Sequence, residues 1–282
     1  MSMPSVAESV RYRLPEDAQP HAGGRAPADA PSRFDAWAGR RRESSHFPSQ
    51  HATFTRTESA SWSPVPAGER NVAVEQYRRL AAALIQAQVE RGVRVIMVTS
   101  SVAQEGKSLT VANLAVTLAR SYQRRTLVID ADSRAPSLHA IFRVSNAYGL
   151  TDYLRAAEDV QVPAIQLQDA LTLLPAGRPT MDPMGGLTSA RMARLIADAA
   201  ETFDFTLIDT PPAAQVPDAG ILAQLADATL LVVGAASTPH AVIKRAVAVL
   251  GKERILGTVL NRAERAGGGR YGYGYGYGHV GQ

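Results

Sequence analysis

The chain has 282 residues, of which 45% are hydrophobic, with a net charge of +4 and no cysteine. This length and apolar content suffice for one medium α/β domain with tails or for two small domains. The lack of cysteine excludes disulfides, thiolate metal ligands and a cysteine nucleophile. No apolar run approaches the ~20 residues of a membrane-spanning helix, no N-terminal segment resembles a secretory signal, and the scattered basic residues do not predict nucleic-acid binding.

Composition divides the chain into three parts. Residues 1–70 are rich in Pro, Ser, Ala, Gly and His and lack a sustained apolar period. Such a segment cannot bury enough surface to offset its ordering entropy, so we expect a disordered N-terminal extension. Residues 71–262 carry the patterns of a folded domain, and residues 263–282 form a Gly- and Tyr-rich tail.

The folded part alternates predicted helices and strands. Apolar spacing predicts helices over Val72–Arg91, Leu109–Arg120, Ser189–Thr202, Ala219–Leu225 and Ala241–Leu250. Apolar runs predict strands over Val93–Val98, Thr126–Ile129, Phe205–Ile208, Thr229–Val233 and Ile255–Leu260, with one or two short strands within Ala164–Leu174. Nearly continuous Val, Ile and Leu is typical of strands covered on both faces. The fold class is therefore a doubly wound, mostly parallel α/β sheet with helices on both faces.

A phosphate-binding loop follows the first predicted strand of this domain. The segment Ser101-Val-Ala-Gln-Glu-Gly106-Lys107-Ser108 lies between that strand and a helix, as in P-loop NTPases. Backbone amides of the loop and of the helix start would face nucleotide phosphates, with Lys107 on the β- and γ-phosphates and Ser108 helping to hold Mg²⁺. The predicted nucleotide-binding residues here are Gln104, Glu105, Gly106, Lys107, Ser108 and Leu109.

Two positions make this Walker motif deviant. Ser101 stands where the pattern has glycine, and Gln104 stands where many such loops have a second glycine. If position 104 requires a positive φ, a side chain there costs about 1–2 kcal/mol. Ser101 is a mild change because serine is small.

Three aspartates follow predicted strands. Asp130 and Asp132 come after Thr126–Ile129, and Asp209 ends the apolar run that begins at Phe205. Because the carboxyl ends of parallel strands meet at one edge, all three are expected beside the P-loop. Carboxylates there would orient Mg²⁺ or accept a proton from an attacking hydroxyl. The predicted catalytic residues are thus Lys107, Asp130, Asp132 and Asp209, and the predicted metal site is Ser108, Asp130, Asp132 and Asp209.

The combination resembles the bacterial tyrosine kinase family, the P-loop autokinases of polysaccharide export and chain-length control. Gly106-Lys-Ser resembles its Walker A motif, Val128-Ile-Asp-Ala-Asp-Ser-Arg134 its A′ motif, and Leu207-Ile-Asp-Thr-Pro-Pro212 its Walker B motif. Leu174-Pro-Ala-Gly177 also matches. The tail, with Tyr271, Tyr273, Tyr275 and Tyr277, resembles the family's autophosphorylation cluster.

This resemblance implies a function and roles. It implies an ATP- and Mg²⁺-dependent, non-specific protein-tyrosine kinase that phosphorylates its own tail tyrosines, in trans, and so regulates polysaccharide polymerisation and export. Asp130 would be the base toward the tyrosine hydroxyl, with Asp132 and Asp209 around the metal. Asn261, in a Leu-Asn-Arg motif with Arg262, would read the adenine.

The resemblance also implies partners. They are a membrane chain-length determinant that activates the kinase, further copies of this chain and a protein-tyrosine phosphatase, but no nucleic acid. The expected location is the cytoplasm, at the inner face of the plasma membrane through that partner. The family's ring-forming motif Glu-x-x-Arg-x-x-Arg lacks its last arginine here, because Glu75 and Arg78 are followed by Ala81, and the ring size stays open.

Two other functions remain alternatives. A partitioning or placement ATPase would share the acidic motifs, but the extra lysine that such proteins often carry early in the loop is absent from Ser101–Gln104. A non-catalytic nucleotide-binding scaffold of an export complex is the other, and the two P-loop departures favour it. The tail could also be a low-complexity end that is not phosphorylated.

Overall fold

The computed structural model describes residues 11–13, 72–180 and 182–263; the rest of the predicted N-terminal extension and the tail tyrosines lie outside this part. The strands, in chain order, are β1 Arg11–Arg13, β2 Val95–Ser100, β3 Thr126–Asp130, β4 Ile165–Gln168, β5 Leu171–Leu174, β6 Phe205–Asp209, β7 Ala228–Gly234 and β8 Ile255–Asn261. The helices are α2 Val72–Arg91, α3 Lys107–Tyr122, α4 Leu138–Phe142, α5 Leu150–Arg155, α6 Met184–Leu187, α7 Ala190–Thr202, α8 Asp218–Leu222 and α9 His240–Leu250, with a 3-10 turn η1 at Lys252–Arg254.

The strands form one sheet in the order β1-β8-β7-β2-β6-β3-β5-β4. The central strand β2 pairs in parallel with both β6 and β7, and β3, β5 and β8 continue the parallel part. Only β1 and β4, at the two edges, run antiparallel to their neighbours. The carboxyl ends of the six parallel strands therefore meet on one side, which is where α/β sheets of this class bind ligands.

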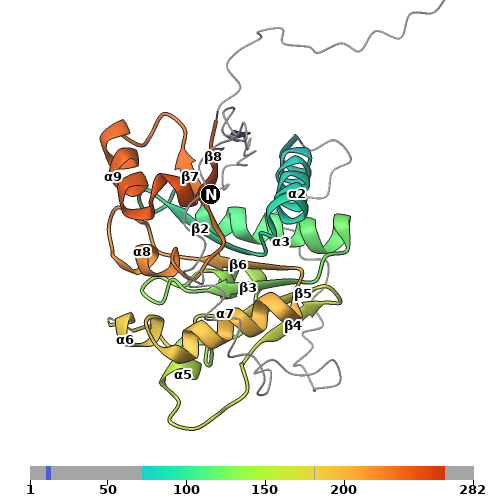
Figure 1. Cartoon of the computed structure of the whole chain (residues 1–282), viewed down its shortest axis with the longest axis vertical. Helices are drawn as coiled ribbons and strands as arrows, with labels where there is room; N and C mark the ends of the chain where they lie inside the picture. Colours follow the sequence, from blue (N-terminus) through green and yellow to red (C-terminus); the bar gives the residue numbers. More distant parts are fainter. Residues whose placement is uncertain (1–10, 14–71, 181, 264–282) are drawn as a thin grey trace, which may run out of the picture.

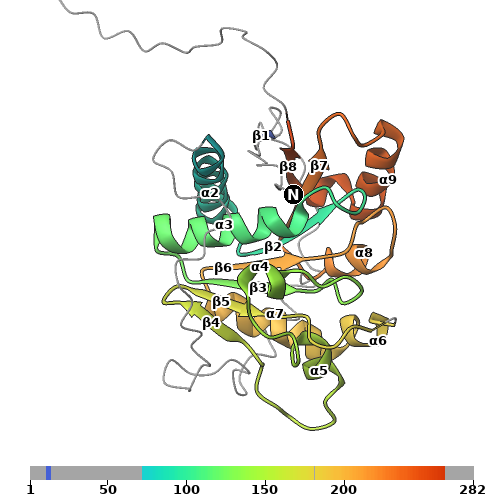
Figure 2. The same cartoon turned by 180° about the vertical axis from the view of Figure 1, so that it is seen from behind.

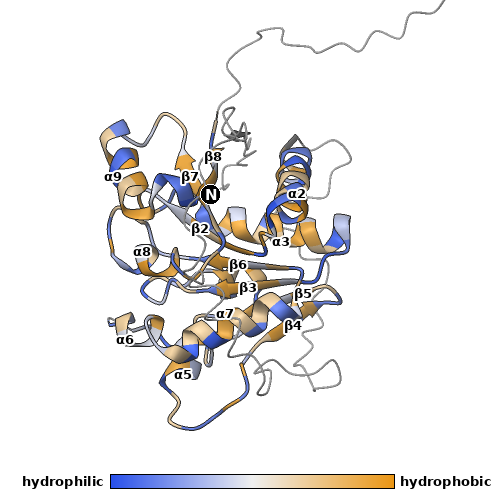
Figure 3. Cartoon of the chain, in the orientation of Figure 1, coloured by the Kyte–Doolittle hydropathy of each residue, from blue (hydrophilic) through white to orange (hydrophobic). Residues whose placement is uncertain are grey.

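Helices cover both faces of the sheet (Figures 1 and 2). Alternate residues of β2 show the division: Ile96 and Val98 belong to the core under α2 and α3, whereas Val95 and Met97 belong to the core under α5 to α9. The six parallel strands are accordingly apolar along most of their length (Figure 3). Two-sided burial explains why they appear in the sequence as continuous apolar runs rather than as alternating ones.

The predicted elements are found, with shifted ends. The helix predicted over Val72–Arg91 is α2, and the apolar segment Ala164–Leu174 contains two strands, β4 and β5. The helices α4, α5 and α6 were not predicted because four to six residues are too few to show a helical period. Within the described helices, none has the length and hydropathy needed to cross a membrane.

The structure differs from the sequence prediction at one short N-terminal segment. Arg11–Arg13 form β1, antiparallel to β8, inside the extension for which no regular structure was expected. An edge strand offers a row of unpaired backbone N–H and C=O groups to which any extended segment can add. This kind of pairing requires no apolar pattern, so the sequence carried no signal for it.

Candidate active site

The P-loop between β2 and α3 has left-handed backbone at two points. Gln104 has φ 65° and Gly106 has φ 90°, so position 104 does have the positive φ that carries strain for a side chain. Gly106 is required for a second reason, because a Cβ there would lie 2.1 Å from Asn261 Nδ2. Ser101 is fully buried and is not among the positive-φ residues. Serine therefore replaces glycine at that position without backbone strain.

Lys107, the first residue of α3, brings two of the aspartates together. Its Nζ lies 2.8 Å from Asp132 Oδ2 and 3.4 Å from Asp209 Oδ1, and it donates to Ser108 Oγ at 3.2 Å. Burial lowers the pKa of Lys107, but the carboxylates of Asp209 and Asp132 outweigh it and leave the pKa above its ordinary value. The ammonium group is therefore charged at neutral pH.

Asp130 ends β3 directly opposite Asp209, which ends the neighbouring strand β6. It is fully buried, and Oδ2 accepts hydrogen bonds from the amides of Ser137 at 3.2 Å and Leu138 at 3.1 Å. Burial, and next the charge of Asp209, raise the pKa of Asp130 to about 7. A carboxyl group that titrates near neutral pH is suited to general-base catalysis.

Asp209 is the most enclosed acid of the site. Its side chain is fully buried, and Oδ2 has no hydrogen-bond partner among the described residues. Burial raises its pKa, and the charge of Lys107 opposes that rise. An orphan carboxylate oxygen in the same cluster as the Ser108 hydroxyl fits Mg²⁺, which takes one or two protein oxygens and completes its shell with phosphates and water. Among the described residues, Asp130, Asp132 and Asp209 do not form a three-residue group that could hold a metal ion, so the predicted metal site with all three aspartates stays a prediction.

Asn261, at the end of β8, lies against the P-loop. Its Nδ2 donates to the Glu105 carbonyl oxygen at 2.9 Å, and its Oδ1 accepts from the Arg262 amide at 2.9 Å. The side chain is fully buried, so both of its polar atoms are used within the protein in this structure. The predicted contacts of Asn261 and Arg262 with adenine stay predictions.

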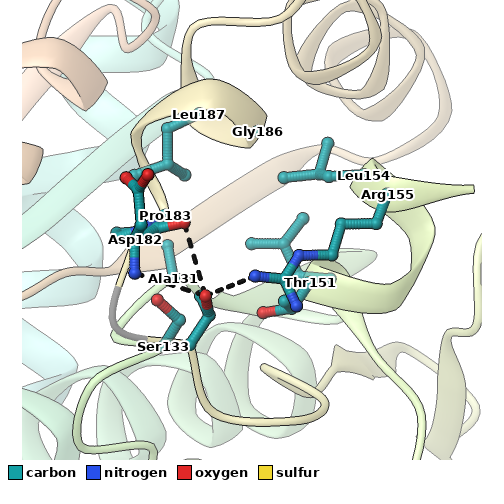
Figure 4. A pocket seen from close by; sticks show the side chains of 11 residues that line it. Ala131, Ser133, Thr151, Leu154, Arg155, Asp182, Pro183, Gly186 and Leu187 are labelled. Atoms are coloured by element: carbon teal, nitrogen blue, oxygen red, sulfur yellow. Dashed lines mark hydrogen bonds between the residues drawn. The ribbon is translucent and has the colours of Figure 1, made fainter.

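A small pocket adjoins the carboxyl end of β3 (Figure 4). Ala131 and Ser133 lie at one side of it, residues of α5 at another, and the segment leading into α6 closes it. Arg155 donates to the Thr180 hydroxyl across the opening. The pocket is small, about 30 Å³, and partly open to solvent.

The structure thus brings together Lys107, Asp130, Asp132 and Asp209, which are buried, and Ser108, which is half-buried, as the spacing predicted. Tyr271, Tyr273, Tyr275 and Tyr277 lie outside the described residues. Sequence reasoning missed two polar groups that bind the P-loop from the side. The Gly234 amide and the Thr238 hydroxyl both donate to the Glu105 carboxylate. Neither group belongs to a motif, and each is more than a hundred residues away in the sequence.

Comparisons with known proteins agree with this site. A family model described as the CobQ/CobB/MinD/ParA nucleotide binding domain matches residues 96–270. The tyrosine-protein kinase YwqD of Bacillus subtilis is 35% identical over 203 residues, which is 70% of this chain and 84% of that protein. The succinoglycan biosynthesis transport protein ExoP of Rhizobium meliloti is 33% identical over 210 residues, 72% of this chain but 26% of that protein.

A solved structure extends the likeness to three dimensions. The kinase domain of the Escherichia coli tyrosine kinase ETK superposes with a TM-score of 0.68 at 26% identity, over 85% of this chain and 91% of that one. The family match covers more than half of the chain, and a kinase of similar length is aligned along most of it. Given the P-loop, the paired acidic strand ends and these likenesses, the chain belongs to the bacterial tyrosine kinase family, within the CobQ/CobB/MinD/ParA class of nucleotide-binding domains.

Proposed function

We propose that this chain is an ATP-dependent protein-tyrosine autokinase that phosphorylates its own tail at Tyr271, Tyr273, Tyr275 and Tyr277. The observation that carries the proposal is the buried cluster at the P-loop, in which Lys107 contacts two carboxylates and a third, Asp130, titrates near neutral pH. The kinase relatives, which share this part of the chain, support the choice of reaction.

The reaction follows from the positions of these groups. Lys107 exchanges its carboxylate contacts for the β- and γ-phosphates of ATP, and the backbone of the loop orients them. Ser108 and Asp209 would hold Mg²⁺, which would neutralise charge on the phosphates. Asp130 accepts the phenolic proton of the acceptor tyrosine. A bond then forms between that oxygen and the γ-phosphorus as the bond to the β–γ bridging oxygen breaks, and ADP leaves.

The tail can reach an active site from the place where it begins. Asn261 lies at the P-loop, and about ten residues separate it from Tyr271, which gives a reach of roughly 35 Å at ~3.5 Å per residue. That distance allows the tail's own site or that of a neighbouring copy. We propose the neighbour, on the resemblance to the family, so that phosphorylation takes place in trans.

The cellular role is proposed from the relatives. ExoP is named as a transport protein of succinoglycan biosynthesis, and we propose that this chain likewise regulates polysaccharide polymerisation and export. The proposed partners are an activating membrane chain-length determinant, further copies of the chain and a tyrosine phosphatase. The proposed location is the cytoplasmic face of the membrane, through the activating partner.

The test is phosphate mapping on the full chain. The purified protein is incubated with Mg²⁺-ATP and the cytoplasmic segment of a candidate activator, and phosphorylated residues are identified by mass spectrometry, with Lys107→Met as the control. Phosphate on the four tail tyrosines that disappears in the control supports the proposal. ATP hydrolysis without phosphotyrosine points to a switch ATPase, and nucleotide binding without either activity points to a scaffold.

A mixing experiment separates trans from cis transfer. The Lys107→Met chain serves as the acceptor, and a chain with all four tail tyrosines changed to phenylalanine serves as the enzyme. Phosphate on the Lys107→Met chain requires transfer between molecules. If wild-type protein is phosphorylated but the mixture is not, transfer occurs within one chain and the trans proposal is wrong.

A further inference from the structure

The side chain of Glu105 points away from the phosphate side of the P-loop and into the protein. It is 3% exposed. Its Oε2 accepts a hydrogen bond from the Val102 amide at 2.8 Å, and its Oε1 accepts from the Gly234 amide at 2.8 Å and from the Thr238 hydroxyl. No lysine or arginine of the described part forms an ion pair with it. A buried carboxylate is thus balanced by two backbone amides and one hydroxyl, as buried charges require.

These donors belong to two separate elements. Val102 lies in the P-loop itself, whereas Gly234 ends β7 and Thr238 lies in the segment that leads into α9. The carboxylate therefore closes the P-loop upon itself and also fastens it to the neighbouring strand. We call Glu105 with Val102, Gly234 and Thr238 the Glu105 clamp.

The backbone of the same residue has a second anchor. Its carbonyl oxygen accepts from Asn261 Nδ2 at 2.9 Å, and Asn261 ends β8, the strand beyond β7. Position 105 is thus tied to two adjacent strands, through its side chain to one and through its main chain to the other. It stands between the left-handed Gln104 and Gly106, so the clamp acts on the part of the loop that turns most sharply.

This loop has more need of an anchor than a glycine-rich one. Gln104 has φ 65° although it carries a side chain, and such a backbone persists where the surroundings enforce it. The phosphate-binding conformation also requires the amides of the loop to point outward together. A carboxylate that binds the loop from behind meets both requirements without contacting the ligand.

We propose that Glu105 is a positioning residue that holds the P-loop in its phosphate-binding conformation by fastening it to β7 and to the segment before α9. The proposal rests on the proposed function for its ligand, the phosphates of ATP or ADP. It assigns to Glu105 a role in nucleotide affinity that operates through Val102, Gly234 and Thr238 rather than through contact with the nucleotide.

The test compares two carboxylates, Glu105 and Asp227, that lie at opposite ends of the neighbouring strands β2 and β7. Glu105→Ala removes the clamp, Glu105→Gln replaces one of its two acceptor oxygens by an NH2 group that cannot accept from a backbone amide, and Thr238→Val removes one donor from the other side. The control is Asp227→Asn, at an exposed carboxylate that also accepts from two backbone amides. Asp227 Oδ2 accepts from the Arg94 and Val95 amides, both at 2.8 Å, and so joins the start of β2 to the start of β7, at the opposite end of these strands from the P-loop. The Kd of MgADP and the KM and kcat for ATP are measured on full-length chains, with thermal unfolding of each.

We expect Glu105→Gln and Glu105→Ala to raise the Kd of MgADP and the KM for ATP about tenfold or more, the size of a lost buried charged hydrogen bond. The value of kcat at saturating ATP should change much less, because bound phosphates re-form the loop. Thr238→Val should act in the same direction with a smaller effect. Asp227→Asn should leave the Kd within about twofold whatever it does to the unfolding temperature.

A rescue tests the mechanism. Gln104→Gly removes the left-handed strain, so the double variant Gln104→Gly/Glu105→Gln should bind MgADP more tightly than Glu105→Gln alone. Wild-type MgADP affinity in a folded Glu105→Gln or Thr238→Val chain overturns the proposal, as does an equal loss in Asp227→Asn or no MgADP binding by the wild type. If binding depends on Glu105 but no tail tyrosine is phosphorylated, the proposed function fails and the role of Glu105 stands.

Discussion

A single ammonium group holds the acidic side of the site together. Lys107 is in contact with Asp132 and Asp209, and Asp130 lies one strand away in register with Asp209. Burial is the main cause of the raised pKa values of Asp130 and Asp209. A neighbouring carboxylate raises each pKa further, Asp209 acting on Asp130 and Asp132 acting on Asp209. The negative charge of these grouped carboxylates attracts cations, both the Lys107 ammonium group and Mg²⁺.

The raised pKa of Asp130 predicts how the free energy of unfolding depends on pH. Its pKa is about 7 when folded against an ordinary value of 3.8, so between these values the folded chain holds a proton that the unfolded chain has lost. The free energy of unfolding of nucleotide-free protein therefore falls as pH rises through this window. Asp130→Asn removes the effect. Its free energy of unfolding relative to wild type should increase by about 2–3 kcal/mol from pH 5 to pH 8.

Urea unfolding of both chains at each pH measures this difference. Any loss of hydrogen bonds in Asp130→Asn shifts its curve equally at all pH values and so cancels in the comparison. Parallel stability curves for the two chains would mean that Asp130 is not protonated near neutral pH.

The positive φ of Gln104 determines whether its replacement by glycine raises or lowers the free energy of unfolding. At φ 65°, Gln104→Gly relieves strain and should raise the free energy of unfolding by up to about 1 kcal/mol, less the entropy that glycine adds to the unfolded chain. The control is the same substitution at Gln86, exposed within α2, where glycine should cost about 1 kcal/mol. Equal losses at the two positions, measured by thermal unfolding, would contradict the strain at Gln104.

Among the elements, α2 carries Glu75, Arg78 and Ala81, the three positions of the Glu-x-x-Arg-x-x-Arg pattern. Glu75 pairs with Arg78 at 3.7 Å and Arg79 at 3.8 Å, and all three side chains are more than half exposed, so these pairs add little to stability. The position of the last arginine of the pattern is Ala81, which is fully buried in the core between α2 and the sheet. The small side chain allows α2 to lie close to α3.

Restoring that arginine should therefore damage the domain. Ala81→Arg forces a charged side chain into an apolar contact and should lower the free energy of unfolding by at least about 2 kcal/mol. Ala82→Arg, one residue along on the exposed side of the same helix, should change it by less than about 0.5 kcal/mol. Thermal unfolding of the two variants decides. Equal stability would show that α2 can turn to present position 81 to solvent.

At the scale of the whole molecule, the proposed modification changes the charge balance. The chain has a net charge of +4, and each phosphotyrosine adds about −1.5 to −2 charges at pH 7. Four of them reverse the sign of the net charge and concentrate the negative charge in the tail. A tail of this charge is repelled by the acidic cluster and the phosphates of a neighbour's site.

We therefore expect phosphorylation to loosen self-association. The fully phosphorylated chain should sediment as a smaller species than the same sample after phosphatase treatment, and added salt should narrow the difference because it screens charge. The chain with four tail tyrosines changed to phenylalanine, incubated with Mg²⁺-ATP, controls for nucleotide effects. Unchanged sedimentation after full phosphorylation would count against charge repulsion as the regulator.

The main elements and the members of the acidic cluster were predictable from the sequence. Strands buried on both faces appear as unbroken apolar runs, and the long helix α2 shows its period clearly. The P-loop and the aspartates at strand ends were predictable because parallel strands bring their carboxyl ends together, whatever lies between them in the chain. Local pattern and this one topological rule were sufficient.

The tertiary structure alone decided which partners these residues have. That Lys107 contacts Asp132 and Asp209, that Glu105 faces Gly234 and Thr238, and that Ala81 is buried all depend on the strand order and on helix packing. The positive φ of Gln104 likewise depends on the anchors around the loop. Sequence spacing carries no information about contacts between segments a hundred residues apart, because these are set by the packing free energy of the whole domain rather than by local preference.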